Sequence, residues 1–322
     1  ATLSAMPTPP SAPPSAPTAA PRSLWGWLNG QPALLLIITT LIWGSNAVAA
    51  RLAVGQVSPM MLTTARWSVA CVALWFVARR QVAAAWPQLR PRWLYLTLMG
   101  VAGFTGFNAL YYTAAHHTSA VNLTIIQGVV PVLVLLGGAL VFRLRVGWLQ
   151  ALGVALTLAG VAMVAARGQW LVLAAMDFNA GDLAVLLASL LYAGYTLGLR
   201  AKPPVPPLVF FAAVAGVAAL ASLPLLAWEV AAGHFFWPTW QGWLIILYVG
   251  LLPSFVSQIT FIRAVELIGP ARAGVFYNLT PVFGPALAVL LLGEPLHAYH
   301  VAALAMVLGG IWVAERLGKP RG

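Results

Sequence analysis

The stretch that decides the fold is Pro270–Ala314, PARAGVFYNLTPVFGPALAVLLLGEPLHAYHVAALAMVLGGIWVA. It predicts two apolar helices, residues 272–293 and 297–314, joined by a Gly-Glu-Pro turn. Pro281 lies within the first helix and has no N–H for the carbonyl of Tyr277, so we expect a kink there. A carbonyl released inside hydrocarbon must face protein or water, and this helix is therefore expected to line a cavity.

The same pattern occurs earlier in the chain at a constant offset of 150 residues. The paired positions are Pro131 and Pro281, Gly160 and Gly310, Ala114 and Ala264, Gly100 and Gly250, and Gly44 and Gly194. The offset holds without a gap from residue 44 to residue 160. The sequence therefore predicts one unit that occurs twice, with kinked helices at Pro131 and Pro281.

The composition places the chain in a membrane. Of its 322 residues, 61% are hydrophobic and 7% are charged, and the mean hydropathy is +0.89. A soluble globule needs a more polar surface than this. The net charge of +11 fits the positive-inside bias of membrane proteins better than nucleic-acid binding. The single cysteine, Cys71, excludes an intrachain disulfide and is expected to have a packing role.

We expect an all-α integral membrane protein with ten transmembrane helices. Their approximate positions are residues 32–51, 59–78, 93–115, 120–142, 146–166, 182–199, 207–228, 241–262, 272–293 and 297–314. The predicted organisation is a disordered Pro/Ala-rich cytoplasmic tail (1–31), a first five-helix repeat (32–166), a second five-helix repeat (182–314) and a cytoplasmic C-terminal tail (315–322).

The distribution of basic residues predicts the orientation. With a cytoplasmic N-terminus, fourteen of the 17 Lys and Arg residues fall on the cytoplasmic side. Arg51 and Arg167 fall outside, and Arg66 lies within a span. Both termini are therefore predicted to be cytoplasmic. Because five is an odd number of crossings, the second repeat enters the membrane from the opposite side, as in transporters that bind substrate between two inverted repeats. A duplicated helical scaffold is the alternative.

Polar and aromatic residues near the middle of spans are the candidates for a substrate cavity, because burying them in hydrocarbon is costly. They are Trp43, Ser45, Asn46, Asn108, Tyr111, Tyr112 and Gln127 in the first half, and Tyr192, Tyr195, Ser257, Gln258, Tyr277 and Asn278 in the second. Ser45/Tyr195, Asn108/Gln258 and Gln127/Tyr277 are at or near matched positions. The alternative role for each is an interhelical hydrogen bond.

Arg66 completes this candidate set as the one basic residue within a span. One interpretation is that it attracts a substrate carboxylate, and the other is that it bonds helix-end carbonyls. The acidic residues fall in loops or at span ends, and the histidines lie at span ends or in loops. A buried proton-coupling group is therefore not expected, and facilitated movement is favoured. We find no metal-ligand cluster, phosphate-binding loop or nucleophile constellation, so no cofactor, metal or enzymatic activity is expected.

The quoted residues also resemble a known family. The second half contains GLLPSFVSQITFIRAVELIGPARAGVFYNLTPVFGPALAVLLLGEPL, and the first contains LIWGSNAVAARLAV, MLTTARWSVA and ALYYTAAHHTSAVNLTIIQGVVPVL. Together, over residues 32–315, they resemble the EamA-type members of the drug/metabolite transporter superfamily. The resemblance implies ten helices in two inverted repeats and small polar or amphipathic substrates. Phe142-Arg143-Leu144 departs from the Leu292-Gly293-Glu294 pattern, so we expect Glu294 to be a cap or turn device.

These observations predict a transporter in the bacterial cytoplasmic membrane that exports amino acids, including aromatic ones, or facilitates their passage by alternating access. It resembles the aromatic amino-acid exporter branch of that superfamily. A sugar-phosphate or nucleotide-sugar transporter and a multidrug transporter are alternatives, and an intramembrane lipid-modifying enzyme is a second alternative. The expected partners are a small-molecule substrate and the lipid bilayer, without nucleic acid, and the expected state is a monomer or weak dimer.

Overall fold

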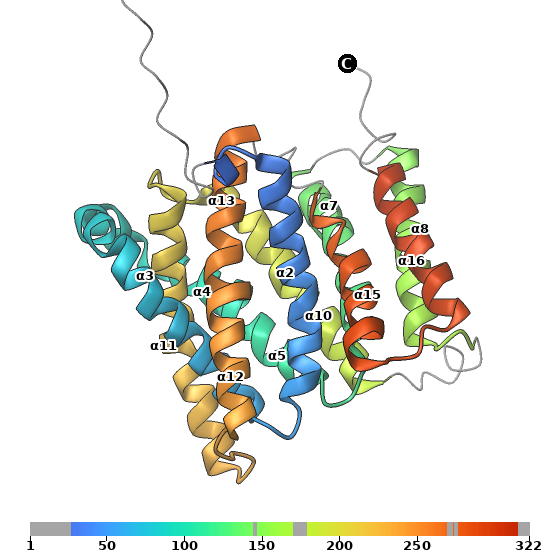
Figure 1. Cartoon of the computed structure of the whole chain (residues 1–322). Helices are drawn as coiled ribbons and strands as arrows, with labels where there is room; N and C mark the ends of the chain where they lie inside the picture. Colours follow the sequence, from blue (N-terminus) through green and yellow to red (C-terminus); the bar gives the residue numbers. More distant parts are fainter. Residues whose placement is uncertain (1–26, 144–146, 170–178, 269–272, 274–275, 315–322) are drawn as a thin grey trace, which may run out of the picture.

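The structure is a computed structural model that describes residues 27–143, 147–169, 179–268, 273 and 276–314 (Figure 1). The predicted C-terminal tail and most of the predicted N-terminal tail lie outside these ranges. Every regular element in the described part of the chain is helical. The fold is therefore all-α, as the sequence predicts.

The first half begins with two long helices and continues through shorter ones. Its elements are α2 (Pro32–Ala53), α3 (Pro59–Leu89), η1 (Arg90–Arg92), α4 (Trp93–Gly100), η2 (Val101–Gly106), α5 (Phe107–Ala114), α6 (Ala120–Gln127), α7 (Val130–Phe142) and α8 (Trp148–Ala165). The second half contains α10 (Ala180–Gly198), η3 (Leu199–Ala201), α11 (Pro207–Ala231), α12 (Trp240–Val249), η4 (Gly250–Val256), α13 (Ser257–Ile268), α15 (Thr280–Leu292) and α16 (Ala298–Trp312).

The helices run between two faces of a single bundle (Figure 1). At the terminal face, α2 begins and α13 and α16 end. At the opposite face, which we call the Glu294 face, α2 ends, α3 and α6 begin, and α15 is followed by Glu294.

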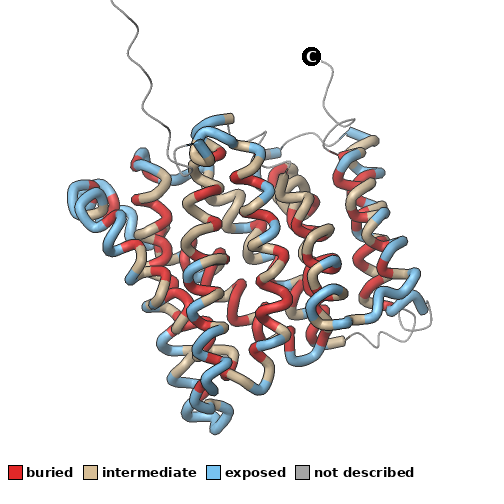
Figure 2. Tube along the Cα trace, in the orientation of Figure 1, coloured by how far each residue is buried: buried red, intermediate tan, exposed pale blue. Residues whose placement is uncertain are grey.

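Among the residues that the structure describes, seven helices are long and apolar enough to cross a membrane, by length and composition. One of them is the continuous stretch Pro59–Ala114 of 56 residues, and the shorter apolar helices Thr280–Leu292 and Ala298–Trp312 accompany the seven. Figure 2 shows buried residues where helices face one another and exposed residues on their outer sides. Leu140 and Leu290, at matched positions, are 81% and 78% exposed. Such an apolar perimeter belongs in contact with lipid.

Helix α3 extends further than the predicted second span, which ends at residue 78. It continues to Leu89, for 31 residues, or about 46 Å at ~1.5 Å per residue. The hydrocarbon core is only about 30 Å thick. Residues 79–89 include Arg, Gln and Ala, which favour helix without favouring hydrocarbon. The apolar pattern thus predicts the end of the membrane-spanning part at residue 78, whereas the helix itself continues to Leu89.

Pro131 and Pro281 lie at the starts of helices. The turn Gly128-Val129 separates α6 from α7, and Pro131 lies in the first turn of α7. Pro281 lies equally in the first turn of α15. A proline is tolerated there because the first N–H groups of a helix have no intrahelical acceptor. At each expected kink a short turn separates two helical segments, and the N–H groups of Gly128 and Leu279 in these turns donate to the carbonyls three residues earlier.

Other features recur at the same 150-residue offset. A π-helical segment occurs at Val101–Gly106 and again at Gly250–Val256. Helices α7 and α15 both end at a residue with positive φ, which is Arg143 (54°) in one and Gly293 (66°) in the other. Arginine has a steric cost in this region that glycine does not. The backbone therefore repeats even where the residue types differ.

Close glycine contacts join α8 to α16. A Cβ placed on Gly310 would lie 2.5 Å from the carbonyl oxygen of Gly153 and 2.7 Å from the backbone nitrogen of Thr157. Real Cβ atoms do not approach backbone so closely. Small residues at helix contacts permit this packing in a membrane, where no hydrophobic force drives helices together.

We predict that Gly310→Ala destabilises the protein by about 1–3 kcal/mol, because the methyl group overpacks the contact between α8 and α16. The matched control is Gly216→Ala in α11, where a Cβ would meet nothing within 4 Å. The control is expected to be neutral or slightly stabilising, since alanine favours helix over glycine. Thermal unfolding of the purified protein in detergent measures both. Equal midpoints for the two variants would contradict the close packing.

Candidate functional site

Segment η4 contains a proline that releases a backbone carbonyl inside the bundle. Pro253 has no N–H, so the carbonyl of Val249, four residues earlier, lacks its usual helical donor. The hydroxyl of Ser254 donates to that carbonyl at 2.7 Å, and Ser254 is 1% exposed. The π-helical turn thus fixes the serine hydroxyl at a buried position.

Arg66 of α3 uses this serine as one of its partners. Its Nε donates to Ser254 Oγ at 2.8 Å. Its Nη1 donates to Asn108 Oδ1 at 2.5 Å and also to the hydroxyl of Tyr112. Arg66 is 4% exposed. All three partners are neutral side-chain oxygens. None is a helix-end carbonyl, which was one of the two interpretations of Arg66 from the sequence.

A second layer of contacts holds the partners of Arg66. Tyr112 donates to Asn46 Oδ1 at 3.1 Å, and Asn108 Nδ2 donates to the carbonyl of Phe104 in η2 at 2.6 Å. The guanidinium carbon lies 5.2 Å from the ring centroid of Trp67, within the range of a cation–π interaction. The network joins α2, α3, α5, η2 and η4, and it includes four of the residues predicted from sequence.

The charge of Arg66 has no carboxylate partner among the described residues. Hydrogen bonds to neutral oxygens lower the cost of burying the cation but do not neutralise it. Its Nη2 donates no hydrogen bond to any described residue. Arg66 therefore retains both an uncompensated charge and an available donor.

A second group of predicted residues meets across the two halves. Trp43 Nε1 donates to Ser257 Oγ at 2.9 Å, and the Trp43 ring lies 5.7 Å from the ring of Tyr277. Gln127 Nε2 donates to the Tyr277 hydroxyl at 3.4 Å. Gln127 and Tyr277 are matched positions of the two halves, and each directly precedes a helix break.

Aromatic rings form a continuous series beside the Arg66 network. The ring centroids of Tyr111 and Phe107 are 5.5 Å apart, those of Phe107 and Tyr192 are 5.4 Å apart, and those of Tyr192 and Tyr195 are 5.5 Å apart. Phe104 continues the series at 5.3 Å from Tyr195. The three tyrosines are predicted site residues, whereas Phe104 and Phe107 are missed by a search for polar groups.

The remaining predicted residues differ in their contacts. Ser45 Oγ lies 2.5 Å from the hydroxyl of Tyr248, a residue absent from the prediction. Gln258 is half-buried and makes no side-chain hydrogen bond within the described part of the chain. Asn278 Oδ1 is buried without a partner, as is Thr280 Oγ1. An unpartnered buried oxygen is costly, so both atoms are free to accept a hydrogen bond.

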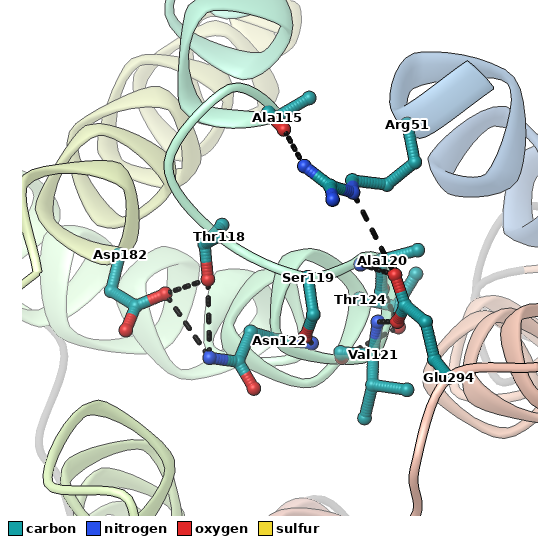
Figure 3. Close-up of polar contacts among 10 residues, drawn as sticks. All are labelled: Arg51, Ala115, Thr118, Ser119, Ala120, Val121, Asn122, Thr124, Asp182 and Glu294. Atoms are coloured by element: carbon teal, nitrogen blue, oxygen red, sulfur yellow. Dashed lines mark hydrogen bonds and ion pairs between the residues drawn. The ribbon is translucent and has the colours of Figure 1, made fainter. Parts of the chain in front are cut away.

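A further polar cluster, not predicted as a site, lies at the Glu294 face (Figure 3). The Glu294 carboxylate accepts the backbone N–H groups of Ala120 and Val121, both at 3.0 Å. Arg51 Nε lies 3.7 Å from the same carboxylate, and Arg51 Nη1 donates to the carbonyl of Ala115 at 2.5 Å. Glu294 therefore caps α6, a helix far away in sequence, in addition to its place in the turn after α15.

Asp182 makes a similar connection at the start of α10. Its Oδ1 accepts from Thr118 Oγ1 at 2.5 Å and from Asn122 Nδ2 at 3.4 Å (Figure 3). A cavity of about 340 Å³ opens beside this cluster, with Arg167, His116 and Glu294 among its lining residues. Burial lowers the pKa of His116, and the nearby His117 lowers it further. The local chemistry is polar and charged, unlike the aromatic interior.

The fold, the membrane-length helices and the buried polar interior are those of a membrane transport protein, and comparison with known proteins identifies the family. The profile of the EamA-like transporter family matches residues 31–166 and again residues 179–315. The chain belongs to the EamA-like transporter family.

Named relatives support the same class. The chain is 23% identical to the uncharacterized transporter YyaM of Bacillus subtilis, over 88% of this chain and 92% of that protein. It is 25% identical to a probable terminal-alkyne amino-acid exporter of Streptantibioticus cattleyicolor, covering 89% and 94%. It is 24% identical to the aromatic amino acid exporter YddG of Ancylobacter novellus, covering 91% and 100%. A solved crystal structure shares the fold with a TM-score of 0.63 at 20% identity, covering 89% of this chain and 97% of that one.

We predict that Ser254→Ala lowers stability by about 1.5–3 kcal/mol, because Arg66 Nε loses a charge-assisted hydrogen bond in a buried position. Ser68→Ala is the matched control. Ser68 is exposed on the same helix as Arg66, and its hydroxyl donates only to the carbonyl of Thr64. The control should change stability by less than about 0.5 kcal/mol. Denaturation of both variants in detergent measures the difference, and a loss below about 0.5 kcal/mol for Ser254→Ala would argue against the Arg66 network.

Proposed function

We propose that this protein exports amino acids, including aromatic ones, or facilitates their passage across a bacterial cytoplasmic membrane by alternating access. The observation that carries the proposal is Arg66, a buried cation without a carboxylate partner in the described chain, beside a series of tyrosine rings. Two relatives whose names specify amino-acid export support the substrate class.

We propose that the chain forms ten transmembrane helices in two inverted five-helix repeats, residues 32–166 and 182–314, around a central cavity. The double match to the family profile and the paired helix breaks and π-helical segments support this arrangement. The excess of basic residues toward the terminal face supports cytoplasmic termini. The Glu294 face would then face the outside.

A zwitterion fits the interior better than an ion with one sign of charge. Its carboxylate would accept from Arg66 Nη2, which has no acceptor among the described residues. Its ammonium would find tyrosine ring faces, which attract cations, and the unpartnered Oδ1 of Asn278. An aromatic side chain would pack on the same rings at little cost. We propose that the fourteen polar and aromatic residues predicted from sequence, Arg66 included, line this cavity.

The alternatives fit less well. A sugar phosphate or nucleotide sugar carries a phosphate group that calls for several cationic partners. Arg66 is the one Lys or Arg that is buried in the described part of the chain. A multidrug carrier of cations would need a buried anion, and the buried carboxylates of the described residues lie at helix ends on the Glu294 face.

Reconstitution in liposomes tests the substrate class. We expect uptake of labelled aromatic amino acids above that of protein-free liposomes, and no uptake of labelled sugar phosphates. The uptake is expected without an imposed pH gradient, because no acidic residue lies at depth in a predicted span. Transport of sugar phosphates but not amino acids would overturn the proposal.

We predict that Arg66→Gln reduces amino-acid uptake at least about tenfold, since a charged hydrogen bond is worth roughly 1.5–3 kcal/mol. Uptake of the corresponding decarboxylated amines, which lack the group that Arg66 would bind, should change much less. Arg79→Gln, at an exposed position of α3, is the control and should leave both unchanged. Equal loss for amino acids and amines would show that Arg66 acts on structure and not on the substrate carboxylate.

A further inference from the structure

Three carboxylates of the second half are bonded to the first half, all at the Glu294 face. Asp182 and Glu294 bind groups near the start of α6, as described above. Glu229, at the end of α11, binds the start of α3. It accepts from Ser58 Oγ at 2.6 Å, from the Met60 N–H at 3.0 Å and from the Met61 N–H at 3.2 Å.

Glu229 and Glu294 accept from backbone N–H groups at helix starts, whereas Asp182 accepts from the side chains of Thr118 and Asn122. The first N–H groups of a helix have no intrahelical acceptor and carry the positive end of the helix dipole, so they favour a carboxylate. Hydrogen bonds to an ionised group are about twice as strong as neutral ones. Asp182 and Glu229 are each 3% exposed, and the Glu294 side chain is 14% exposed. Water therefore competes weakly for Asp182 and Glu229, whereas Glu294 also lines the cavity of about 340 Å³.

The arrangement has no counterpart at the terminal face within the described residues. The positions 150 residues before Asp182, Glu229 and Glu294 are Pro32, Arg79 and Leu144. None of these three residues carries a carboxylate. The fourth acidic residue of the described chain, Glu266, is exposed near the terminal face and pairs with Arg263 of its own helix at 3.2 Å. The two halves repeat the same backbone, but in the described part of the chain carboxylates join them on one side alone.

We propose that Asp182, Glu229 and Glu294 together form the gate that holds the Glu294 face closed. This inference rests on the proposed alternating-access cycle, in which one half moves against the other. Opening at the Glu294 face separates the halves there and breaks these bonds. Opening at the terminal face leaves them intact. The three carboxylates therefore favour the state that is closed at the Glu294 face, and they are positioning residues for the transport cycle.

Cysteine labelling of the full chain in nanodiscs tests the gate without any substrate. Cys71→Ser provides a background free of other thiols, because the chain has one cysteine. Thr124 lies one helical turn after the start of α6 and is 1% exposed. A thiol there would become accessible to reagent when the Glu294 face opens, so Thr124→Cys provides the gate reporter. We expect Glu229→Gln, Glu294→Gln and Asp182→Asn each to raise the labelling rate of this reporter about tenfold, since each amide keeps the shape but loses the charge.

A second reporter separates gating from loss of structure. Ala264 lies in α13 toward the terminal face and is fully buried, so Ala264→Cys provides the terminal-face reporter. The gate requires that the labelling rate of this second reporter does not rise in the same variants. Glu266→Gln is the matched control and should leave the rate at the gate reporter unchanged.

An unchanged rate at the gate reporter, a rise at both reporters, or an equal rise in Glu266→Gln would each overturn the gate. The outcome is independent of the substrate, so a failed gate and a failed amino-acid assay can be told apart. If the protein transports no amino acid but shows the expected labelling, the gate is supported and the proposed substrate class is wrong.

Discussion

A polar group inside this bundle needs a partner from the protein, from water or from a ligand, because hydrocarbon supplies neither donors nor acceptors. The contacts that lead from Pro253 to Arg66 show the consequence. The proline frees the carbonyl of Val249, Ser254 satisfies that carbonyl, and the same serine accepts from Arg66. Through this serine the proline is linked to one of the three hydrogen-bonding partners of Arg66.

The broken helices follow from the same constraint. A turn in the middle of an apolar segment exposes backbone groups that lipid cannot satisfy. The breaks before α7 and α15 therefore lie among polar and aromatic side chains. Gln127 and Tyr277, which precede the two breaks, contact each other. Asn278 and Thr280 keep unpartnered oxygens at one of them. Irregular backbone and unsatisfied polar atoms coincide where we place the substrate cavity.

The two halves share their backbone but differ in where their charges lie. Matched helix breaks, π-helical segments and positive-φ helix ends show the shared backbone. Arg66 has Gly216 as its counterpart, and Asp182, Glu229 and Glu294 have Pro32, Arg79 and Leu144. A symmetric scaffold permits two equivalent openings, and an asymmetric charge distribution makes them energetically unequal. Directional behaviour would then come from a few side chains and not from the fold.

The sequence by itself determined the helical class and the approximate position of most apolar helices, and it singled out a few of the buried polar residues, among them Asn46, Arg66 and Asn108. Apolar runs, prolines and the 150-residue offset can be read from the sequence without knowing how the helices pack. The tertiary structure alone decided that Pro131 and Pro281 begin new helices, and that α3 continues to Leu89. It also decided the partners of Arg66 and Glu294, since Ser254 and Ala120 are 188 and 174 residues away from them. A single chain carries no local sign of which distant groups will meet, because that depends on how whole helices pack.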